Sequence, residues 1–269
     1  MVLDGEKLGI LKPGDTIVEA TSGNTGIALA LAASIKGYNT TITMPEKMSS
    51  EKVNLLKGLG AKIIRTPNEA AFDDPRSHIS ISHKLRDEKG YILLDQYSNP
   101  SNPIAHYDQL AEEILYQCDG KVDAIVIGTG TGGTMCGVSR KVKEKLPETL
   151  MVGADPYGSI LAMPQTKNEG KFPINKIEGI GYDFVPRTCG RQFVDHWMKT
   201  GDPESIDCAK KLMREGLFVG GSAGSVMAAA LKFIKEIGWE NDPTKRVVCV
   251  FSDSIRNYMT KFLSNEWCV

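Results

Sequence analysis

Three glycine-rich stretches of the chain carry polar side chains at spacings that suit the binding of small anions. They are residues 21–26 (TSGNTG), 128–134 (GTGTGGT) and 220–225 (GGSAGS). We expect each to follow a strand and to open a helix, where the first backbone N–H groups lack partners inside the helix. Phosphate and carboxylate groups bind well at such positions. These stretches are therefore the candidate functional residues.

The first stretch offers more polar groups than a helix cap requires. A cap needs one Ser, Thr, Asp or Asn, whereas residues 21–26 supply Thr21, Ser22, Asn24 and Thr25. We therefore predict that this stretch binds a carboxylate or a phosphate.

The second stretch has two functional interpretations. Gly128, Gly130 and Gly133 match the G-x-G-x-x-G pattern, and Asp155 follows 22 residues after Gly133, as in the dinucleotide sites of NAD-dependent oxidoreductases. The same spacing also fits a tighter cradle for one phosphate, formed by backbone N–H groups and threonine hydroxyls. A turn without function is disfavoured, because glycines lower the stability of the folded chain.

The third stretch contains Gly220-x-Ser222-x-Gly224, the spacing of the nucleophile elbow of α/β-hydrolases. Those enzymes place their histidine after the serine, and here every histidine precedes it: His78, His83, His106 and His196. A serine hydrolase is therefore disfavoured. We predict that a tight turn points the Ser222 hydroxyl toward a ligand, with simple helix capping as the alternative.

Short apolar strands alternate with helical stretches along the chain, a pattern typical of parallel sheets covered by helices on both faces. Strands are predicted at 16–20, 40–44, 62–65, 91–94, 124–127, 150–154, 217–219 and 247–251. Helices are predicted at 26–35, 49–56, 77–88, 105–117, 135–145, 203–215 and 225–237, with a less regular stretch up to residue 191.

The prolines at 100 and 103 suit a crossover between two lobes. We therefore predict an α/β protein with two open, mostly parallel twisted sheets that carry helices on both faces. The smaller lobe covers residues 1–98 and the larger lobe covers residues 99–269. Ligands of such sheets bind beyond the carboxyl ends of the strands.

Composition narrows the class of protein. The charges nearly cancel, with 32 Lys+Arg against 33 Asp+Glu, which disfavours nucleic acid and membrane surfaces as partners because both require a basic face. The six cysteines form no C-x-x-C pair, so we predict no metal site and a reducing compartment. The chain shows neither a signal peptide nor an apolar run that could span a bilayer. We predict a cytoplasmic protein.

Four further motifs add to the three glycine-rich stretches: residues 44–52 (MPEKMSSEK), 95–97 (DQY), 178–184 (EGIGYDF) and 256–262 (RNYMTKF). Together they resemble the cysteine synthase and cystathionine β-synthase family of fold-type II pyridoxal-phosphate enzymes, and its cystathionine β-synthase branch in particular. The resemblance extends from about Lys12 to Trp267. It implies the tryptophan synthase β-like fold and pyridoxal 5′-phosphate as the cofactor.

The resemblance also implies roles for individual residues. Asn24 would hydrogen-bond the phenolic oxygen of the cofactor, and Ser222 would face its pyridine nitrogen. The phosphate would be held by Gly130, Thr131, Gly132, Gly133 and Thr134. The substrate α-carboxylate would be bound by Thr21, Ser22, Thr25 and Gln96, and the side where the second substrate enters would be lined by Tyr97, Gly179 and Tyr182.

The implied reaction is that of a pyridoxal-phosphate-dependent lyase in transsulfuration and cysteine biosynthesis. Serine and homocysteine would condense to cystathionine, and cysteine in place of serine would release hydrogen sulfide. The implied assembly is a homodimer.

One family motif is missing. The Schiff-base lysine of the family lies in a Ser-x-Lys-Asp-Arg stretch upstream of the first glycine-rich stretch, and no such stretch occurs in the 269 residues. We therefore predict no catalytic lysine in this chain. It is interpreted as a fragment of an active enzyme, as one part of a larger assembly, or as a non-catalytic homologue that binds pyridoxal phosphate or a partner.

Overall fold

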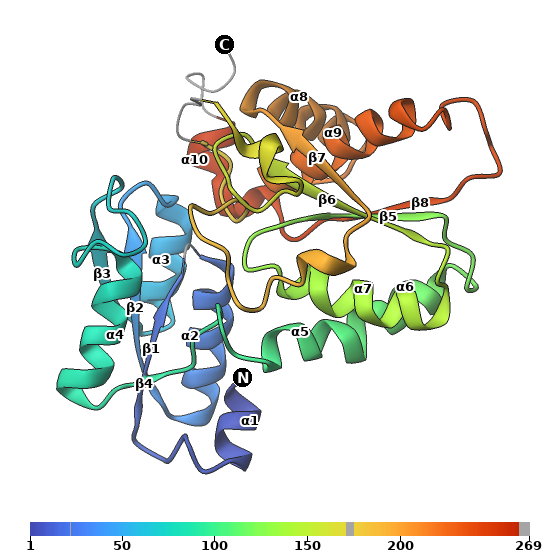
Figure 1. Ribbon diagram of the computed structural model, residues 1–269. Coiled ribbons are helices and arrows are strands. Elements are labelled where there is room, and N and C mark those ends of the chain that lie inside the picture. The colour runs from blue at the N-terminus through green and yellow to red at the C-terminus, as the bar shows by residue number, and fades with distance from the viewer. Residues whose placement is uncertain (22, 171–174, 264–269) are drawn as a thin grey trace. The chain divides into compact units, whose positions relative to one another are not determined.

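Parallel strand pairing organises both parts of the chain. The computed structural model describes residues 1–21, 23–170 and 175–263 (Figure 1). They form two compact units, one of Met1–Asn99 together with the segment that begins at Arg256, and one of Pro100–Ile255. Each unit contains one four-stranded sheet, and all the strand pairs are parallel.

The sheet of the first unit has the order β3-β2-β1-β4. Its strands are β1 (Thr16–Ala20), β2 (Asn39–Pro45), β3 (Lys62–Thr66) and β4 (Ile92–Leu93), and its helices are α1 (Val2–Lys7), α2 (Asn24–Lys36), α3 (Ser50–Gly58), α4 (His78–Lys89) and α10 (Met259–Phe262). Ala30 of α2, Ile42 of β2 and Leu56 of α3 share one apolar cluster, so α2 and α3 cover the same face. On the other face, the Thr43 hydroxyl donates to the carbonyl of His78, which begins α4.

The sheet of the second unit has the order β7-β6-β5-β8. Its strands are β5 (Ala124–Gly128), β6 (Leu150–Pro156), β7 (His196–Thr200) and β8 (Val247–Val250), and its helices are α5 (Ser101–Ala105), α6 (Ala111–Gln117), α7 (Gly133–Lys145), α8 (Asp202–Arg214) and α9 (Gly221–Glu236). Alternate residues of β5 face opposite sides: Ile125 packs with α6 and α7, and Val126 packs with α9. Helices therefore cover both faces, as Figure 1 shows.

The predicted fold class is confirmed, and three element predictions are wrong. Residues 217–219 do not form a strand, because Val219 makes only an isolated antiparallel bridge with Ser254. The fourth strand of the second sheet is β7, which the sequence pattern missed. The helix predicted from residue 105 begins at Ser101, because Pro103 lies in its first turn, where proline is tolerated.

The segment that begins at Arg256 belongs with the first unit rather than with residues 99–255. Lys52 Nζ of α3 donates to the Tyr258 hydroxyl at 2.9 Å, and Thr260 N donates to Glu51 Oε1 at 2.5 Å. These contacts join the segment to α3. The predicted lobe boundary after residue 98 stays a prediction.

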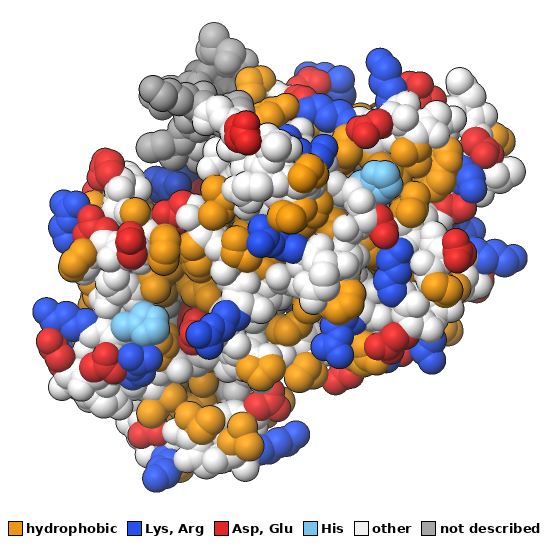
Figure 2. Space-filling view, in the orientation of Figure 1, with side chains coloured by type: hydrophobic (Ala, Val, Ile, Leu, Met, Phe, Trp, Pro, Cys, Tyr) orange, Lys and Arg blue, Asp and Glu red, His pale blue; other side chains and the backbone are white. Residues whose placement is uncertain are grey.

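Charged side chains of both signs are interspersed over the face of the molecule in Figure 2, in keeping with the net charge of −1. Within the described residues, none of the helices combines the length and the apolar character needed to cross a membrane.

The packing of α7 against α5 leaves no room for a side chain at Gly137. A Cβ there would lie 2.1 Å from the carbonyl oxygen of Pro103. We predict that Gly137→Ala lowers the free energy of unfolding by about 1–3 kcal/mol, because the helices must separate. Gly58→Ala on α3 is the control, since a Cβ at Gly58 meets nothing within 4 Å. Urea denaturation of both variants tests this prediction, and equal stabilities would contradict it.

Candidate functional site

Loops that follow neighbouring parallel strands lie at the same edge of the sheet. In the first unit, residues 21–26, which we call the carboxylate loop after their predicted ligand, follow β1, and Gln96 follows β4. Thr25 Oγ1 donates to Gln96 Oε1 at 2.7 Å, and Gly23 N donates to Thr21 Oγ1 at 3.1 Å. The structure thus brings together three of the residues predicted to bind the substrate.

The other residues of this unit that were predicted to bind the cofactor or the substrate differ in how deeply they are buried. Asn24 is exposed as the first residue of α2, and Tyr97 is buried next to Gln96. Ser22 lies outside the described residues. Gln96 is fixed from two sides, because its Nε2 donates to the carbonyl of Ala20 at 2.6 Å and its backbone N donates to Glu19 Oε1 at 3.0 Å.

Glu19 is a site residue that the sequence interpretation missed. It is completely buried in β1, and its Oε2 has no hydrogen-bond partner among the described residues. Burial raises the pKa of Glu19 to about 8, against the effect of the hydrogen bond from Gln96. The carboxyl group is therefore mostly neutral at pH 7. The signal available in the sequence was a single carboxylate within an otherwise apolar strand.

In the second unit, residues 128–134, which we call the phosphate loop after their predicted ligand, join β5 to α7. Gly132 precedes α7 with φ of 77° and has no side chain to cap the helix, while Gly133 N donates to Thr131 Oγ1 at 3.4 Å. Thr131 is held at both ends: its Oγ1 accepts from Asn102 Nδ2 at 3.1 Å, and its carbonyl accepts from Thr188 Oγ1 at 2.8 Å. The loop is a fixed backbone at a helix N-terminus, which suits an anion.

Close contacts make glycine necessary in the phosphate loop. A Cβ at Gly130 would lie 2.5 Å from the carbonyl oxygen of Gly179, and a Cβ at Gly133 would lie 2.0 Å from Asn102 Oδ1. Thr129 is completely buried, and its Oγ1 lacks a partner within the described part of the chain. Backbone that side chains cannot cover, beside an unsatisfied hydroxyl, fits a single phosphate group.

Thr134 Oγ1 lies 3.2 Å from His106 Nε2, which comes from the π-helical turn His106–Leu110. Burial lowers the pKa of His106, so the imidazole is mostly neutral near pH 7. This histidine therefore orients the threonine hydroxyl rather than supplying a cation to the loop.

Ser222 is buried in the first turn of α9, not in a loop as the sequence predicted. The helix begins at Gly221. The residue before it is fixed by a hydrogen bond, because Gly220 N donates to the carbonyl of Asp253 at 3.0 Å. Val226, one turn further along α9, has a methyl group 3.3 Å from where a Cβ of Gly128 would stand. The start of α9 thus lies near the phosphate loop.

Gly179 and Tyr182 also lie beside the phosphate loop. Between them, Gly181 N donates to the carbonyl of Thr129 at 2.8 Å. Ser159 holds the far end of this segment, because Tyr182 N donates to Ser159 Oγ at 3.1 Å. Both residues therefore lie beside the phosphate loop, and their role at the second substrate stays a prediction.

Asp155 does not lie where a dinucleotide site needs it. Its side chain is completely buried and accepts from Lys199 Nζ at 2.7 Å, and the same ammonium donates to the carbonyl of Ser159 at 3.0 Å. This pair supports the Ser159 segment and cannot reach a ribose. Asp155 therefore cannot serve as the acidic residue that a dinucleotide site requires.

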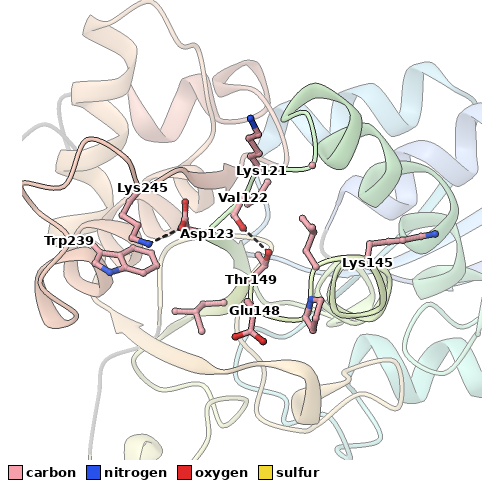
Figure 3. Close-up of a pocket in the computed structure, with 12 residues that line it drawn as sticks. Lys121, Val122, Asp123, Lys145, Glu148, Thr149, Trp239 and Lys245 are labelled. Carbon is pink, nitrogen blue, oxygen red and sulfur yellow. Dashed lines mark hydrogen bonds and ion pairs between the residues drawn. The ribbon is translucent and has the colours of Figure 1, made fainter.

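A cavity of about 530 Å³ opens at the amino ends of β5 and β6 (Figure 3). Its lining includes Lys245, whose Nζ lies 3.0 Å from Asp123 Oδ1 and 4.8 Å from the centroid of the Trp239 ring. The phosphate loop follows the carboxyl end of β5, at the opposite edge of the sheet. This cavity is therefore separate from the candidate site.

Residues 1–253 match the family model described as "Pyridoxal-phosphate dependent enzyme". The chain belongs to this family. Cystathionine beta-synthase of Dictyostelium discoideum is 55% identical over 271 residues, which cover 100% of this chain and 53% of that protein. Cystathionine beta-synthase of Saccharomyces cerevisiae is 48% identical, covering 99% of this chain and 54% of that protein. The chain thus spans about half the length of these relatives.

Two further comparisons extend the likeness. Cysteine synthase A of Escherichia coli is 39% identical, with 98% of this chain and 81% of that protein covered. The crystal structure of the O-acetylserine dependent cystathionine beta-synthase from Helicobacter pylori superposes with a TM-score of 0.87 at 34% identity, covering 97% of this chain and 81% of that one. These findings confirm the predicted family, the fold class, the cofactor pyridoxal 5′-phosphate and a pyridoxal-phosphate-dependent lyase at the level of the family.

The raised pKa of Glu19 predicts a pH dependence of stability. Between about pH 4.5 and about 8 the native state keeps a proton that the unfolded state has released, so stability present below this window is lost as the pH rises through it. The slope reaches at most about 1.4 kcal/mol per pH unit. We expect Glu19→Gln to abolish this decline, whereas Glu88→Gln, at an exposed carboxylate, keeps it. Denaturation at several pH values tests this, and parallel curves for all three proteins would refute it.

Proposed function

We propose that this chain is the core of an enzyme that replaces the β-hydroxyl of serine with the sulfur of homocysteine to give cystathionine. The observation that carries this proposal is the 55% identity, over the whole chain, to a cystathionine beta-synthase. The phosphate loop supports it, because Gly130 and Gly133 leave room for backbone alone. Serine, homocysteine and cysteine are the proposed substrates.

The resemblance to the family assigns the contacts to the cofactor residue by residue. Gly130, Thr131, Gly132, Gly133 and Thr134 hold its phosphate, and Asn24 donates a hydrogen bond to its phenolic oxygen. Ser222 faces the pyridine nitrogen with a neutral hydroxyl and thereby limits protonation of the ring. When bound, pyridoxal phosphate withdraws electrons from the α-carbon of an amino acid, which weakens the bonds to the α-proton and to the β-substituent.

The substrate would be oriented by the first unit. Thr21, Ser22, Thr25 and Gln96 bind the α-carboxylate, and the hydrogen bond between Thr25 and Gln96 fixes both groups in advance. Tyr97 borders the second substrate, together with Gly179 and Tyr182. The hydrogen bonds of Gly181 and Tyr182 support this assignment, because they hold their segment against the phosphate loop and Ser159.

We also propose a cytoplasmic homodimer. The described cysteines Cys118, Cys136, Cys189, Cys208 and Cys249 are all thiols, which supports a reducing compartment.

A second candidate is a homologue that binds pyridoxal phosphate without catalysis. It is favoured by the lack of a Ser-x-Lys-Asp-Arg stretch in the 269 residues. Lysines near the carboxylate loop in sequence offer no substitute: Lys7 and Lys12 are exposed, and Lys36 lies at the far end of α2, about 18 Å from Asn24 by the rise of the helix.

The two candidates predict different products from serine and homocysteine. Measured on the full-length protein with added pyridoxal phosphate, the first predicts cystathionine by mass spectrometry and a cofactor that borohydride fixes to a lysine. Peptide mapping would then name that lysine. Bound cofactor without product and without fixation would contradict the first candidate and support the second. Heat-denatured chain is the control for the slow reaction of free cofactor with amino acids.

A further inference from the structure

Among the residues that the structure describes, Lys52 has the largest completely buried side chain, with 1% of its surface exposed. It lies in the first turn of α3, the helix that follows β2. Because β2 pairs with β1 in parallel, this turn stands beside the loop that follows β1. Burying an ammonium group costs free energy, so a lysine in this position calls for a compensating role.

The Lys52 side chain lies directly against the carboxylate loop. A Cβ at Gly23 would stand 2.4 Å from Lys52 Cδ and 2.9 Å from Lys52 Nζ. Both the methylene stem and the ammonium group therefore occupy the space that a side chain at Gly23 would need. Gly23 is also the residue that precedes α2, so the cation adjoins the positive end of that helix.

A segment distant in sequence holds the ammonium in place. Lys52 Nζ donates to the Tyr258 hydroxyl at 2.9 Å and lies 4.4 Å from the centroid of its ring, although 206 residues separate the two. The segment is itself anchored to α3, since Thr260 Oγ1 donates to Glu51 Oε2 at 3.0 Å, and Lys261 Nζ donates to the carbonyl of Lys47.

We propose that Lys52 supplies the positive charge that binds the substrate α-carboxylate at the carboxylate loop, with Tyr258 as the residue that orients it. This inference rests on the proposed function, which places the carboxylate at residues 21–26. Thr21, Thr25 and Gln96 are neutral at neutral pH, so they contribute hydrogen bonds without net charge. A buried cation beside them acts through a medium of low polarisability, where Coulomb attraction is strong.

A comparison of L-serine with L-serine methyl ester separates charge from packing, because the ester lacks the negative charge. Binding to protein loaded with pyridoxal phosphate is measured by calorimetry. We expect Lys52→Met to weaken the binding of L-serine by about 10-fold or more and to leave the ester within about 3-fold. Lys52→Arg keeps the charge and retains most of the affinity for L-serine. The control is Lys57→Met, which removes an exposed lysine of the same helix and changes neither ligand.

The outcomes discriminate between the inference and the proposed function. Wild-type affinity for L-serine, or an equal loss for both ligands, in a folded Lys52→Met variant would overturn the role of Lys52 alone. Wild-type protein that binds neither ligand would overturn the proposed function as well. If Lys52→Met does not fold, Tyr258→Phe decides: a loss of affinity confined to L-serine supports the proposal, and unchanged affinity refutes it.

Discussion

Contacts that leave no room for a Cβ at Gly130 and Gly133 of the phosphate loop are the constraint on which the candidate site depends. The carbonyl of Gly179 and the amide of Asn102 occupy the space where a Cβ of Gly130 or Gly133 would lie. These contacts press two other segments of the second unit onto the loop. The same packing holds the Gly179–Tyr182 segment at the side of the loop, where Gly181 N donates to the carbonyl of Thr129.

The first unit, unlike the phosphate loop of the second, places ionisable side chains next to its candidate binding residues. Beneath its carboxylate loop it buries two ionisable side chains, Glu19 and Lys52, at nearly full depth. Burial keeps Glu19 mostly neutral, so that it accepts a hydrogen bond from Gln96 without repelling a bound carboxylate. In our proposal the ammonium group of Lys52 attracts that carboxylate. A neutral carboxyl group at Glu19 and an attracting ammonium group at Lys52 would together give the carboxylate loop its preference for anions.

Much of this architecture could be predicted from the sequence, because parallel strands buried on both faces form continuous apolar runs. Strands such as β1 and β5 were located within a residue or two for this reason. β7 was missed since its pattern is broken by Lys199, a polar residue that is buried only because Asp155 pairs with it. Residues 217–219 resemble a strand locally but find no strand partner, which only the fold reveals.

The glycine-rich stretches could be identified because each combines turn residues with hydroxyls in a short span. Glu19 and Lys52 could not be identified as site residues in this way. Their significance lies in burial and in partners that are remote in sequence, Gln96 for Glu19 and Tyr258 for Lys52. Such pairings depend on the order of the strands and on the path of the segment after Arg256, neither of which a local pattern encodes.

The central claim is that the phosphate loop recognises the phosphate of the cofactor. Equilibrium binding of pyridoxal 5′-phosphate and of pyridoxal, which lacks that phosphate, tests it most directly, in the wild type and in Gly132→Val. A Cβ at Gly132 would lie 2.5 Å from Cys189 Cα, whereas at Gly216, which shares a positive φ, it would meet nothing within 4 Å. The account predicts about 100-fold tighter binding of the phosphorylated form, lost in Gly132→Val and kept in Gly216→Val. Equal affinity of the wild type for the two forms would contradict it.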